Sequence, residues 1–300
     1  MTNHKHLRVV IEDIYANNNE LTMDYEIRLI NEFRYSNLYI PAKKDEFTLN
    51  FIIYEDEDLK LIPLFTDRYE FEKFFKNLDD IHLMQNSFEL YQNIIKTSDF
   101  DGFILNPSSE KYVFTREFIL DIKNIPKTNF YTTDTYTVDE LKHLKSLKNE
   151  SLERFMENPA NIGDYEALFE EFTKSVLLTL MVSDIDLTSK ARDGVISMMD
   201  SGPLAQMYTD NVGGVYATIF SGEDKMKFVE SDKYKYSQVI NLAMLVNFVL
   251  SEDMDGIVLN PGSDNVLIPR VTLLRYSLGF ERFANDGKLS DSIYYMFPIE

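Results

Sequence analysis

The sequence predicts an α+β protein built from two tandem homologous domains, each a mixed or antiparallel sheet with flanking helices. Three observations lead to this fold class. Residues 99–107 read Asp-Phe-Asp-Gly-Phe-Ile-Leu-Asn-Pro, and residues 253–261 read Asp-Met-Asp-Gly-Ile-Val-Leu-Asn-Pro. Other landmarks recur in the same order in both halves. Segments with helical spacing alternate with short β-like runs in each half. We expect the two copies to pack with an approximate two-fold relation.

The shared landmarks set the domain boundaries. Asp-Tyr-Glu occurs at 24–26 and again at 164–166, and Leu-Phe-Thr-Asp at 64–67 is matched by Ile-Phe-Ser-Gly at 219–222. Gene duplication explains this order better than coincidence does. We therefore predict one domain over residues 1–128 and a second over 138–300. A segment rich in Thr and Tyr separates them as a linker, at 126–136.

The first copy is expected to begin with two helices and a strand. Apolar residues recur at helical spacing over residues 7–15 and again over 23–35. Residues 37–41 are rich in β-forming residues, so we predict a short strand there.

A hairpin and a capped helix are expected next. Residues 47–54 and 59–65 are β-like runs on either side of the acidic turn 55–58. Thr66 or Asp67 can then cap a helix, because a side-chain oxygen at this position accepts a backbone N–H that has no partner within the helix.

The repeated segment itself reads as a turn, a buried strand and a second turn. A helix over 86–96 leads into it. Asp-Gly tolerates unusual backbone angles, Phe-Ile-Leu forms the strand, and Asn-Pro ends it. A return strand over 112–114 completes a hairpin, and a short helix over 116–122 closes the copy.

The second copy repeats this order with several differences. Thr-Val-Asp-Glu at 137–140 fits a capping box, which begins a helix expected over 138–156. The first strand, 176–182, is longer and more apolar than its match in copy one. An insertion near 190–203 and a C-terminal extension over 280–300 have no counterpart. These divergent segments are where we expect a specific function to lie.

The composition excludes several classes of function. The chain has 50 Asp and Glu residues against 30 Lys and Arg, a net charge of −20, so nucleic acid and anionic membranes are poor partners. Cysteine is absent, which excludes disulfides, thiol nucleophiles and zinc–thiolate sites. The 4 histidines have no match between the copies, which argues against a His-based triad or zinc site. We expect no cofactor, and a cytoplasmic location, because neither a signal peptide nor a membrane span is recognisable.

The paired aspartates of the repeat, Asp99 with Asp101 and Asp253 with Asp255, are the best candidates for a metal site. Two carboxylates at this spacing can hold Mg²⁺ or Ca²⁺. The same Asp-x-Asp-Gly pattern also suits a turn, because Asp side chains accept hydrogen bonds from nearby backbone N–H groups. The turn is the interpretation we favour, and neither segment continues with the ligand pattern of an EF-hand.

An arginine recurs at the same offset after each Asn-Pro. Arg116 and Arg270 could bind a carboxylate or phosphate in a bidentate manner. They could equally pair with Asp101 and Asp255 of their own domains, which we favour. The whole repeated motif is thus a structural or ligand-binding candidate: Asp99, Asp101, Gly102, Asn106, Pro107, Arg116, Asp253, Asp255, Gly256, Asn260, Pro261 and Arg270.

These landmarks resemble a known family. Pro-Leu-Phe-Thr-Asp at 63–67, a following helix, Asp-Gly-Phe-Ile-Leu-Asn-Pro and then Tyr-Val-Phe are similar to the N-terminal domain of the SseB family of prokaryotic proteins. The second copy matches through Ile-Phe-Ser, Asp-Gly-Ile-Val-Leu-Asn-Pro-Gly and Val-Leu-Ile-Pro. The resemblance implies α+β domains and no established reaction, and it carries no catalytic residues onto this chain. A tandem of two such domains departs from the family's single N-terminal domain.

The function we expect is therefore non-enzymatic. A binding or regulatory protein that acts through protein–protein contacts fits the absence of a recognisable catalytic set. The alternative is a sensor of an amino-acid-like or acidic metabolite held near Arg116 or Arg270. A third possibility is a metal-dependent enzyme that uses the Asp-x-Asp pairs.

Overall fold

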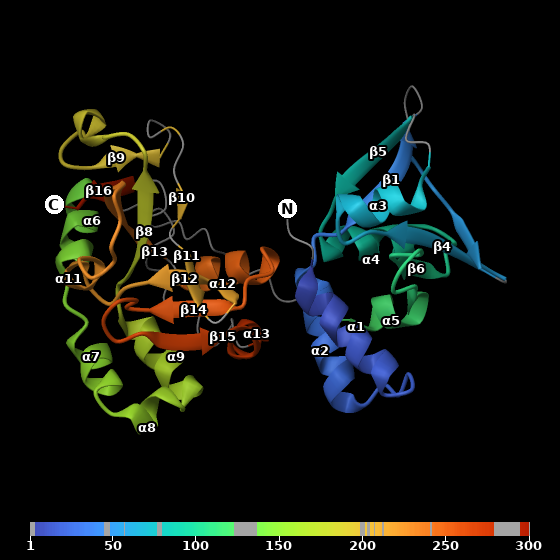
Figure 1. Ribbon diagram of the computed structural model, residues 1–300, viewed down its shortest axis with the longest axis horizontal. Helices are drawn as coiled ribbons and strands as arrows, with labels where there is room; N and C mark the ends of the chain where they lie inside the picture. The colour runs from blue at the N-terminus through green and yellow to red at the C-terminus, as the bar shows by residue number, and fades with distance from the viewer. Residues whose placement is uncertain are drawn as a thin grey trace. The chain divides into compact units, whose positions relative to one another are not determined.

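The computed structural model (Figure 1) describes residues 4–44, 49–56, 58–76, 80–122, 137–198, 202, 205–206, 208–211, 213–240, 242–278 and 295–299. Helices and strands occur throughout, which confirms the predicted α+β class. The chain divides into two compact units. Unit 1 comprises Met1–Asn124 with Ser251–Asp253, and unit 2 comprises Ile125–Leu250 with Met254–Glu300. The predicted linker lies outside the described residues.

The described strands of unit 1 form two sheets. Their bounds are β1 (Tyr39–Lys44), β2 (Leu49–Phe51), β3 (Tyr54–Asp56), β4 (Leu59–Leu64), β5 (Ile81–Gln85), β6 (Gly102–Leu105) and β7 (Tyr112–Thr115). One sheet has the order β3-β4-β6-β7, with β4 and β6 parallel and the other pairs antiparallel. The other is antiparallel and has the order β2-β1-β5. A bridge between Tyr39 and Phe65 connects them.

Helices pack against these sheets and enclose an apolar core. They are α1 (Lys5–Ala16), α2 (Met23–Tyr35), α3 (Arg68–Phe74), α4 (Phe88–Thr97) and α5 (Arg116–Asp121). The Thr22 side chain caps α2 by accepting the Tyr25 N–H at 3.4 Å. The buried Phe33 of α2 then stacks on Phe114 of β7, with ring centroids 4.1 Å apart. The predicted helices over 7–15 and 23–35 are confirmed.

Two predictions for the strands of unit 1 need correction. The run 47–54 was expected to pair as one strand with 59–65, but β2 pairs with β1, and only β3 pairs with β4. The chain passes from one sheet to the other between β2 and β3. The β propensity of the residues cannot predict this change, because propensity does not depend on which strand is the partner. Strand β5 was not predicted at all, since Ile-His-Leu-Met-Gln contains several good helix formers.

Within the part of unit 2 that the structure describes, the strands also form two sheets. Their bounds are β8 (Leu177–Ser183), β9 (Ile196–Ser197), β10 (Ala205–Gln206), β11 (Tyr208–Asn211), β12 (Gly214–Ile219), β13 (Tyr234–Ile240), β14 (Gly256–Leu259), β15 (Val266–Pro269) and β16 (Tyr295–Pro298). One sheet has the order β11-β12-β14-β15, with β12 and β14 parallel. The other has the order β10-β8-β13-β16-β9. A bridge between Leu178 and Phe220 connects them, as Tyr39 and Phe65 connect the sheets of unit 1.

The helices of unit 2 include one correction. Their bounds are α6 (Val138–Ser146), α7 (Glu150–Met156), α8 (Pro159–Ile162), α9 (Tyr165–Lys174), α11 (Glu223–Met226), α12 (Leu242–Ser251) and α13 (Arg270–Leu278), with a 3₁₀ turn at Thr188–Lys190. The predicted capping box of Thr137 and Glu140 is confirmed. The helix predicted over 138–156 is instead split into α6 and α7. Asn149 lies at the break, and its side chain donates to the Val176 carbonyl oxygen and accepts the Val176 N–H.

The two divergent segments of unit 2 meet in one sheet. Strand β9 comes from the predicted insertion and β16 from the predicted C-terminal extension. Strand β16 pairs with β13 on one side and with β9 on the other. The buried Met296 and Phe297 of β16 join the apolar core of this unit. These additions therefore cover an edge of the sheet with which, in the described part of unit 1, no strand pairs. None of the described helices combines the length and hydrophobicity needed to cross a bilayer.

Candidate functional site

The Asn-Pro turn of unit 1 lies at the carboxyl ends of the parallel strands β4 and β6, where ligands often bind to sheets with parallel strands. Asn106 follows β6 with a left-handed φ of 42°, and its side chain is buried. Its Oδ1 accepts the Thr66 N–H at 3.1 Å, and its Nδ2 donates to Thr66 Oγ1 at 3.0 Å and to Glu110 Oε2 at 2.7 Å. One asparagine thus joins the ends of two strands to the turn that follows.

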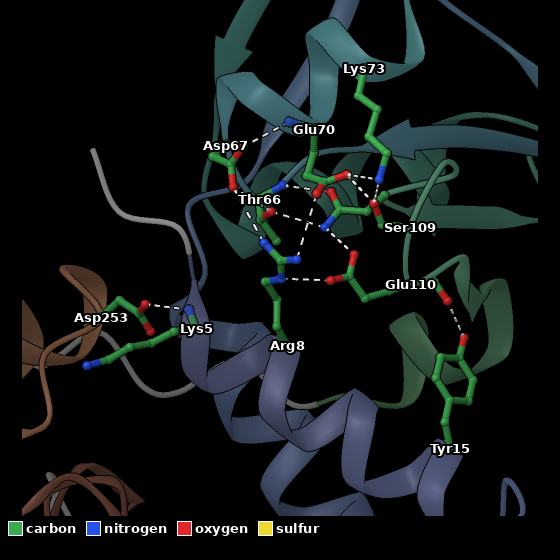
Figure 2. A network of polar contacts seen from close by, with 11 residues as sticks. Lys5, Arg8, Tyr15, Thr66, Asp67, Glu70, Lys73, Ser109, Glu110 and Asp253 are labelled. Atoms are coloured by element: carbon green, nitrogen blue, oxygen red, sulfur yellow. Dashed lines mark hydrogen bonds and ion pairs between the residues drawn. The ribbon is translucent and has the colours of Figure 1, made fainter.

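A group of charged and polar side chains surrounds this asparagine. We call it the Arg8 cluster. It comprises Asn106, which bonds to Thr66 and Glu110, together with the side chains labelled in Figure 2 as Arg8, Thr66, Asp67, Glu70, Lys73, Ser109 and Glu110. Arg8 Nε lies 2.7 Å from Glu110 Oε1, while the Arg8 Nη atoms lie 3.8 Å from Asp67 Oδ2 and 3.7 Å from Glu70 Oε1. The side chains of Glu70 and Glu110 are only 3% and 6% exposed. Arg8 therefore attaches α1 to the strand ends through partly desolvated ion pairs.

The other oxygens of these carboxylates also have partners within unit 1. Asp67 Oδ1 caps α3 by accepting the Glu70 N–H at 2.9 Å, as predicted. The Ser109 hydroxyl donates to Glu70 Oε2, and Lys73 Nζ donates to Ser109 Oγ at 2.6 Å. These contacts are all made by groups of the protein itself.

Tyr15 adds a neutral donor beside the cluster. Its hydroxyl donates to the Glu110 carbonyl oxygen at 2.6 Å. Burial raises the pKa of Tyr15, and the negative charge of Glu110 raises it further. The hydroxyl therefore remains protonated and able to donate at neutral pH.

The chemistry of the Arg8 cluster favours a structural role. A general acid or base must present its reacting atom to a substrate proton. The carboxylates here are turned toward Arg8, Asn106 and the first turn of α3 instead. The cluster therefore holds α1 against the ends of β4 and β6 through ion pairs and hydrogen bonds.

Unit 2 repeats the asparagine and its bonds. Asn260 has a left-handed φ of 51° and is buried. Its Oδ1 accepts the Ser221 N–H at 2.8 Å, and its Nδ2 donates to Ser221 Oγ at 2.9 Å and to Asp264 Oδ2 at 2.7 Å. Ser221 and Asp264 thus do for Asn260 what Thr66 and Glu110 do for Asn106.

The surrounding charges are exchanged between the units. In unit 1 the positively charged residue is Arg8 on α1, and the negatively charged residue is Glu70, three residues after the N-cap of α3. Unit 2 has an acid on α7, Glu153, whose Oε1 accepts from Ser221 Oγ at 3.4 Å, and a base three residues after the N-cap of α11, Lys225. Both units thus contain the asparagine, but the charges around it have opposite signs. A structural contact can accept such a reversal, whereas a catalytic site that requires a particular acid or base cannot.

The aspartate of each Asp-Gly pair is part of the sheet framework. Asp101 Oδ2 accepts the N–H of Lys60 in β4 at 2.8 Å. Asp255 Oδ2 accepts the N–H of Val215 in β12 at 2.7 Å. Each carboxylate thus extends the pairing of its parallel strands by one hydrogen bond, which fits the turn that we favoured from the sequence.

The glycine after each aspartate is required by a close approach of two strands. Gly102 has a φ of 155°, and a Cβ added there would lie 2.1 Å from the Phe114 carbonyl oxygen. Gly256 has a φ of 153°, and its Cβ would lie 2.2 Å from the Ile268 carbonyl oxygen. The repeated glycine therefore allows the β6–β7 and β14–β15 hairpins to form. Pro107 and Pro261 continue the chain from the left-handed asparagines into the following turns.

The two repeated arginines bind backbone carbonyls. Arg116 Nη1 donates to the Ser98 and Phe100 oxygens at 3.0 and 2.9 Å, directly after α4. The ion pair predicted between Arg116 and the Asp101 carboxylate does not form. Arg116 contacts Asp101 through its backbone N–H instead, which donates to the Asp101 carbonyl oxygen at 2.7 Å. Arg270 also donates to backbone carbonyl oxygens, those of Val249 and Leu250 at the end of α12 and that of Met254. Arg270 as a whole is 6% exposed.

The first aspartates of the two motifs have different surroundings. The Asp99 side chain is 86% exposed and lies 3.8 Å from Lys60 Nζ, whereas Asp253 is buried with a φ of 59°. Among the described residues, no group of three or more His, Cys, Asp and Glu side chains is arranged to hold a metal ion. The structure therefore does not bring the predicted carboxylate pairs together with further ligands.

Sequence reasoning missed most of the Arg8 cluster. Arg8 appears in the sequence as an ordinary polar position of an amphipathic helix, and Glu70 as an acid in the first turn of another. Glu110 lies four residues after Asn106, as Asp264 lies four residues after Asn260. The one available signal was the shared register of Asn106 and Glu110 with Asn260 and Asp264, which share a four-residue spacing.

Comparison with known proteins gives no relative for this chain. No protein-family model, no curated protein and no solved structure matches it.

Proposed function

We propose that the chain is a non-catalytic, cytoplasmic binding protein of two homologous SseB-like domains, which acts through contact with another protein. The observation that carries this proposal is the outer edge of β5 in unit 1, with which no strand among the described residues pairs. Ile81, Leu83 and Met84 remain partly exposed there. Partly exposed apolar side chains on an edge strand are typical of a surface that another polypeptide covers.

The comparison with unit 2 supports this interpretation of β5. Gln85 of β5 pairs with Tyr39, and Val239 of β13 pairs with Leu178. Tyr39 and Leu178 make the equivalent bridges between sheets, so the two pairs align β5 with β13. In β13, residues 236–240 are all buried, and β16 covers its outer edge. The same sheet position is thus covered by β16 in unit 2, whereas no described strand pairs with it in unit 1.

The matching sheets also support two homologous domains. The order β3-β4-β6-β7 corresponds to β11-β12-β14-β15, and β2-β1-β5 corresponds to β10-β8-β13. The parallel pair has the same register, since Gly102 lies opposite Leu61 and Gly256 opposite Tyr216. A two-fold relation between the domains stays a prediction.

The alternatives from the sequence receive less support. A metabolite sensor was expected to use Arg116 or Arg270, but the donors of both guanidinium groups described above are directed at backbone carbonyls. An enzyme was expected to use the Asp-x-Asp pairs, but Asp101 and Asp255 hydrogen-bond to neighbouring strands. The protein-binding proposal needs neither set of residues.

A photo-crosslinking experiment tests the proposal. The full-length protein carries p-benzoylphenylalanine at His82, an exposed position on β5, and is irradiated in cells of its host. The matched control carries it at Tyr69, which is 71% exposed on α3 of the same unit. We expect a defined protein adduct from position 82 and none of that mass from position 69. Adducts from neither position, or the same adducts from both, would contradict the proposed binding at β5.

A further inference from the structure

The backbone of β5 has one set of hydrogen-bonding groups directed away from its sheet. In an antiparallel strand, the N–H and C=O of one residue point to the same side, and successive residues alternate. The Pro41 carbonyl oxygen accepts the Ile52 N–H from beyond β2, so Ile40 and Ala42 face β5. Their register partners are Met84 and His82.

It follows which residues face outward. If Met84 and His82 bond to β1, then Ile81, Leu83 and Gln85 direct their N–H and C=O groups to the open side. The Asn86 N–H donates to the Leu38 carbonyl oxygen at 3.0 Å. Asn86 therefore faces the same side as Met84, two residues before it, which agrees with this assignment. No strand within the described residues pairs with that side of β5.

Unit 2 shows how such an edge is occupied. Leu178 exchanges both of its backbone hydrogen bonds with Phe220, so it faces away from β13. By the same parity, Lys235 and Ser237 of β13 face outward, and there they meet β16. Ser237 lies opposite Phe297, and the Lys235 carbonyl oxygen accepts the Ile299 N–H at 3.1 Å. Leu83 and Ile81 are the positions of β5 that correspond to Ser237 and Lys235.

The composition of β5 leaves its edge unprotected. Natural edge strands are commonly blocked by lysine, proline, a bulge or a covering element. Residues 81–85, Ile-His-Leu-Met-Gln, contain no proline and no Lys, Arg, Asp or Glu. Figure 1 shows β5 on the outside of its sheet, beside β1.

We infer that the open edge of β5 binds an extended segment of a partner protein by antiparallel strand addition. This inference rests on the proposed function and gives it a mode of recognition. The backbone of Ile81, Leu83 and Gln85 supplies the hydrogen bonds, and the partly exposed side chains on β5 select apolar or aromatic residues at alternate positions. The segment 295–298, Tyr-Met-Phe-Pro, which covers β13, is an example of such chemistry within this chain.

Charge indicates which kind of partner supplies the segment. The chain carries a net charge of −20, so two copies would repel each other on approach. A segment flanked by Lys or Arg is attracted instead. The occupant is therefore an apolar strand with basic flanks from a different protein.

A selection from a displayed library of random 12-residue peptides tests the inference on the full-length protein. We expect the enriched peptides to alternate apolar residues between basic flanks. A synthetic copy that is N-methylated at the amides facing β5 should bind at least tenfold more weakly, whereas methylation of the amides facing away should change binding less than twofold. Equal effects of both methylation patterns, or no enriched peptide at all, would overturn strand addition.

Variants of the protein test the same hydrogen bonds from the side of β5. In Leu83→Pro the lost N–H is one that faces outward, so binding should fall at least tenfold while the circular dichroism spectrum is kept. Tyr69→Ala, at an exposed position of α3, is the control, and we expect its binding to be unchanged. A dimer in sedimentation equilibrium that Leu83→Pro abolishes would assign the edge to a second copy and overturn the heterologous partner.

The two proposals can fail separately. An adduct from position 82 together with peptides that are insensitive to methylation would leave protein binding in place and remove strand addition. Failure of both the crosslink and the peptide selection would remove the proposed function as well.

Discussion

Two asparagines, Asn106 and Asn260, are the residues that best explain why the repeated motif recurs. Each adopts a left-handed backbone, and each joins the ends of two parallel strands with a single side chain. Asparagine suits this position because it tolerates the left-handed region and offers both a donor and an acceptor. The motif is therefore conserved within the chain by geometry.

The first prediction concerns this side chain. Asn106→Ala removes the acceptor for the buried Thr66 N–H and the donor to Glu110, and it places alanine at a φ of 42°. We expect a loss of about 3 kcal/mol in the free energy of unfolding, measured by urea titration. Asn18→Ala is the control, since Asn18 has a φ of 55° on an exposed turn and should lose only about 1 kcal/mol. Equal losses would show that backbone strain alone explains the asparagine.

The second prediction concerns the glycine of the Asp-Gly pair. Gly102→Ala brings a Cβ against the Phe114 carbonyl oxygen, so the β6–β7 hairpin must separate or bend. We expect a loss of at least about 3 kcal/mol in the same titration. Gly213→Ala also has a positive φ, 85°, but its Cβ would meet nothing within 4 Å, and it should cost about 1 kcal/mol. A mild effect at Gly102 would mean that the two strands can separate easily.

At the scale of elements, helix α1 depends on a charge that no local pattern reveals. Arg8→Met removes the cation from beside Glu110 and Glu70, whose side chains are almost fully buried. Because Arg8 itself is 28% exposed, we expect a loss of about 2 kcal/mol, which is smaller than for a fully buried pair. The readout is the free energy of unfolding together with hydrogen exchange in α1.

Arg28→Met is the matched control for Arg8. Arg28 lies 3.2 Å from Asp13, which is on α1, but the two side chains are 37% and 42% exposed. Such a solvated ion pair should contribute less than about 1 kcal/mol. If both variants lose the same stability, the burial of the Arg8 cluster has no energetic consequence.

The start of α6 should depend on pH. Hydrogen bonds from the Thr137 N–H and hydroxyl lower the pKa of Glu140. A pKa that is lower in the folded state contributes stability above the pKa of the unfolded state, and this contribution is lost as the pH falls through the folded value. At pH 7 we expect the α6 amides of Glu140→Gln to be less protected from hydrogen exchange than those of wild type. This difference in protection should shrink as the pH falls from 7 to 3. Asp139→Asn, outside the capping box, should show no such convergence in hydrogen exchange.

At the scale of the whole molecule, the main difference between the units is the cover of one sheet edge. Removing residues 295–300 deletes β16 with the buried Met296 and Phe297, which should destabilise unit 2 by more than about 4 kcal/mol. Hydrogen exchange read by mass spectrometry should show faster exchange in β13 and no change in β5. Equal acceleration in β5 would show that the two units do not unfold independently.

Much of each unit could be predicted from the sequence because the signals are local. The helix over 23–35 follows from its apolar spacing and the Thr22 cap, and the 102–105 strand follows from the turns on either side. Strand β5 and the change of sheet after β2 could not be predicted, because they depend on partners far away in the chain. The Arg8 cluster was missed for the same reason, since Arg8 meets Glu110 only after the sheet has formed.

By itself, the sequence determined the α+β class, the repeated turn–strand–turn and the side chains that such turns require, because backbone preferences act over a few residues. Only the tertiary structure decided that the repeated arginines bind carbonyls and that the charges around the repeated asparagine are reversed between the units. It also decided that β16 covers the edge of β13, whereas no described strand pairs with the matching edge of β5. These outcomes depend on burial and on strand pairing between distant segments, and neither has a local signature in the chain.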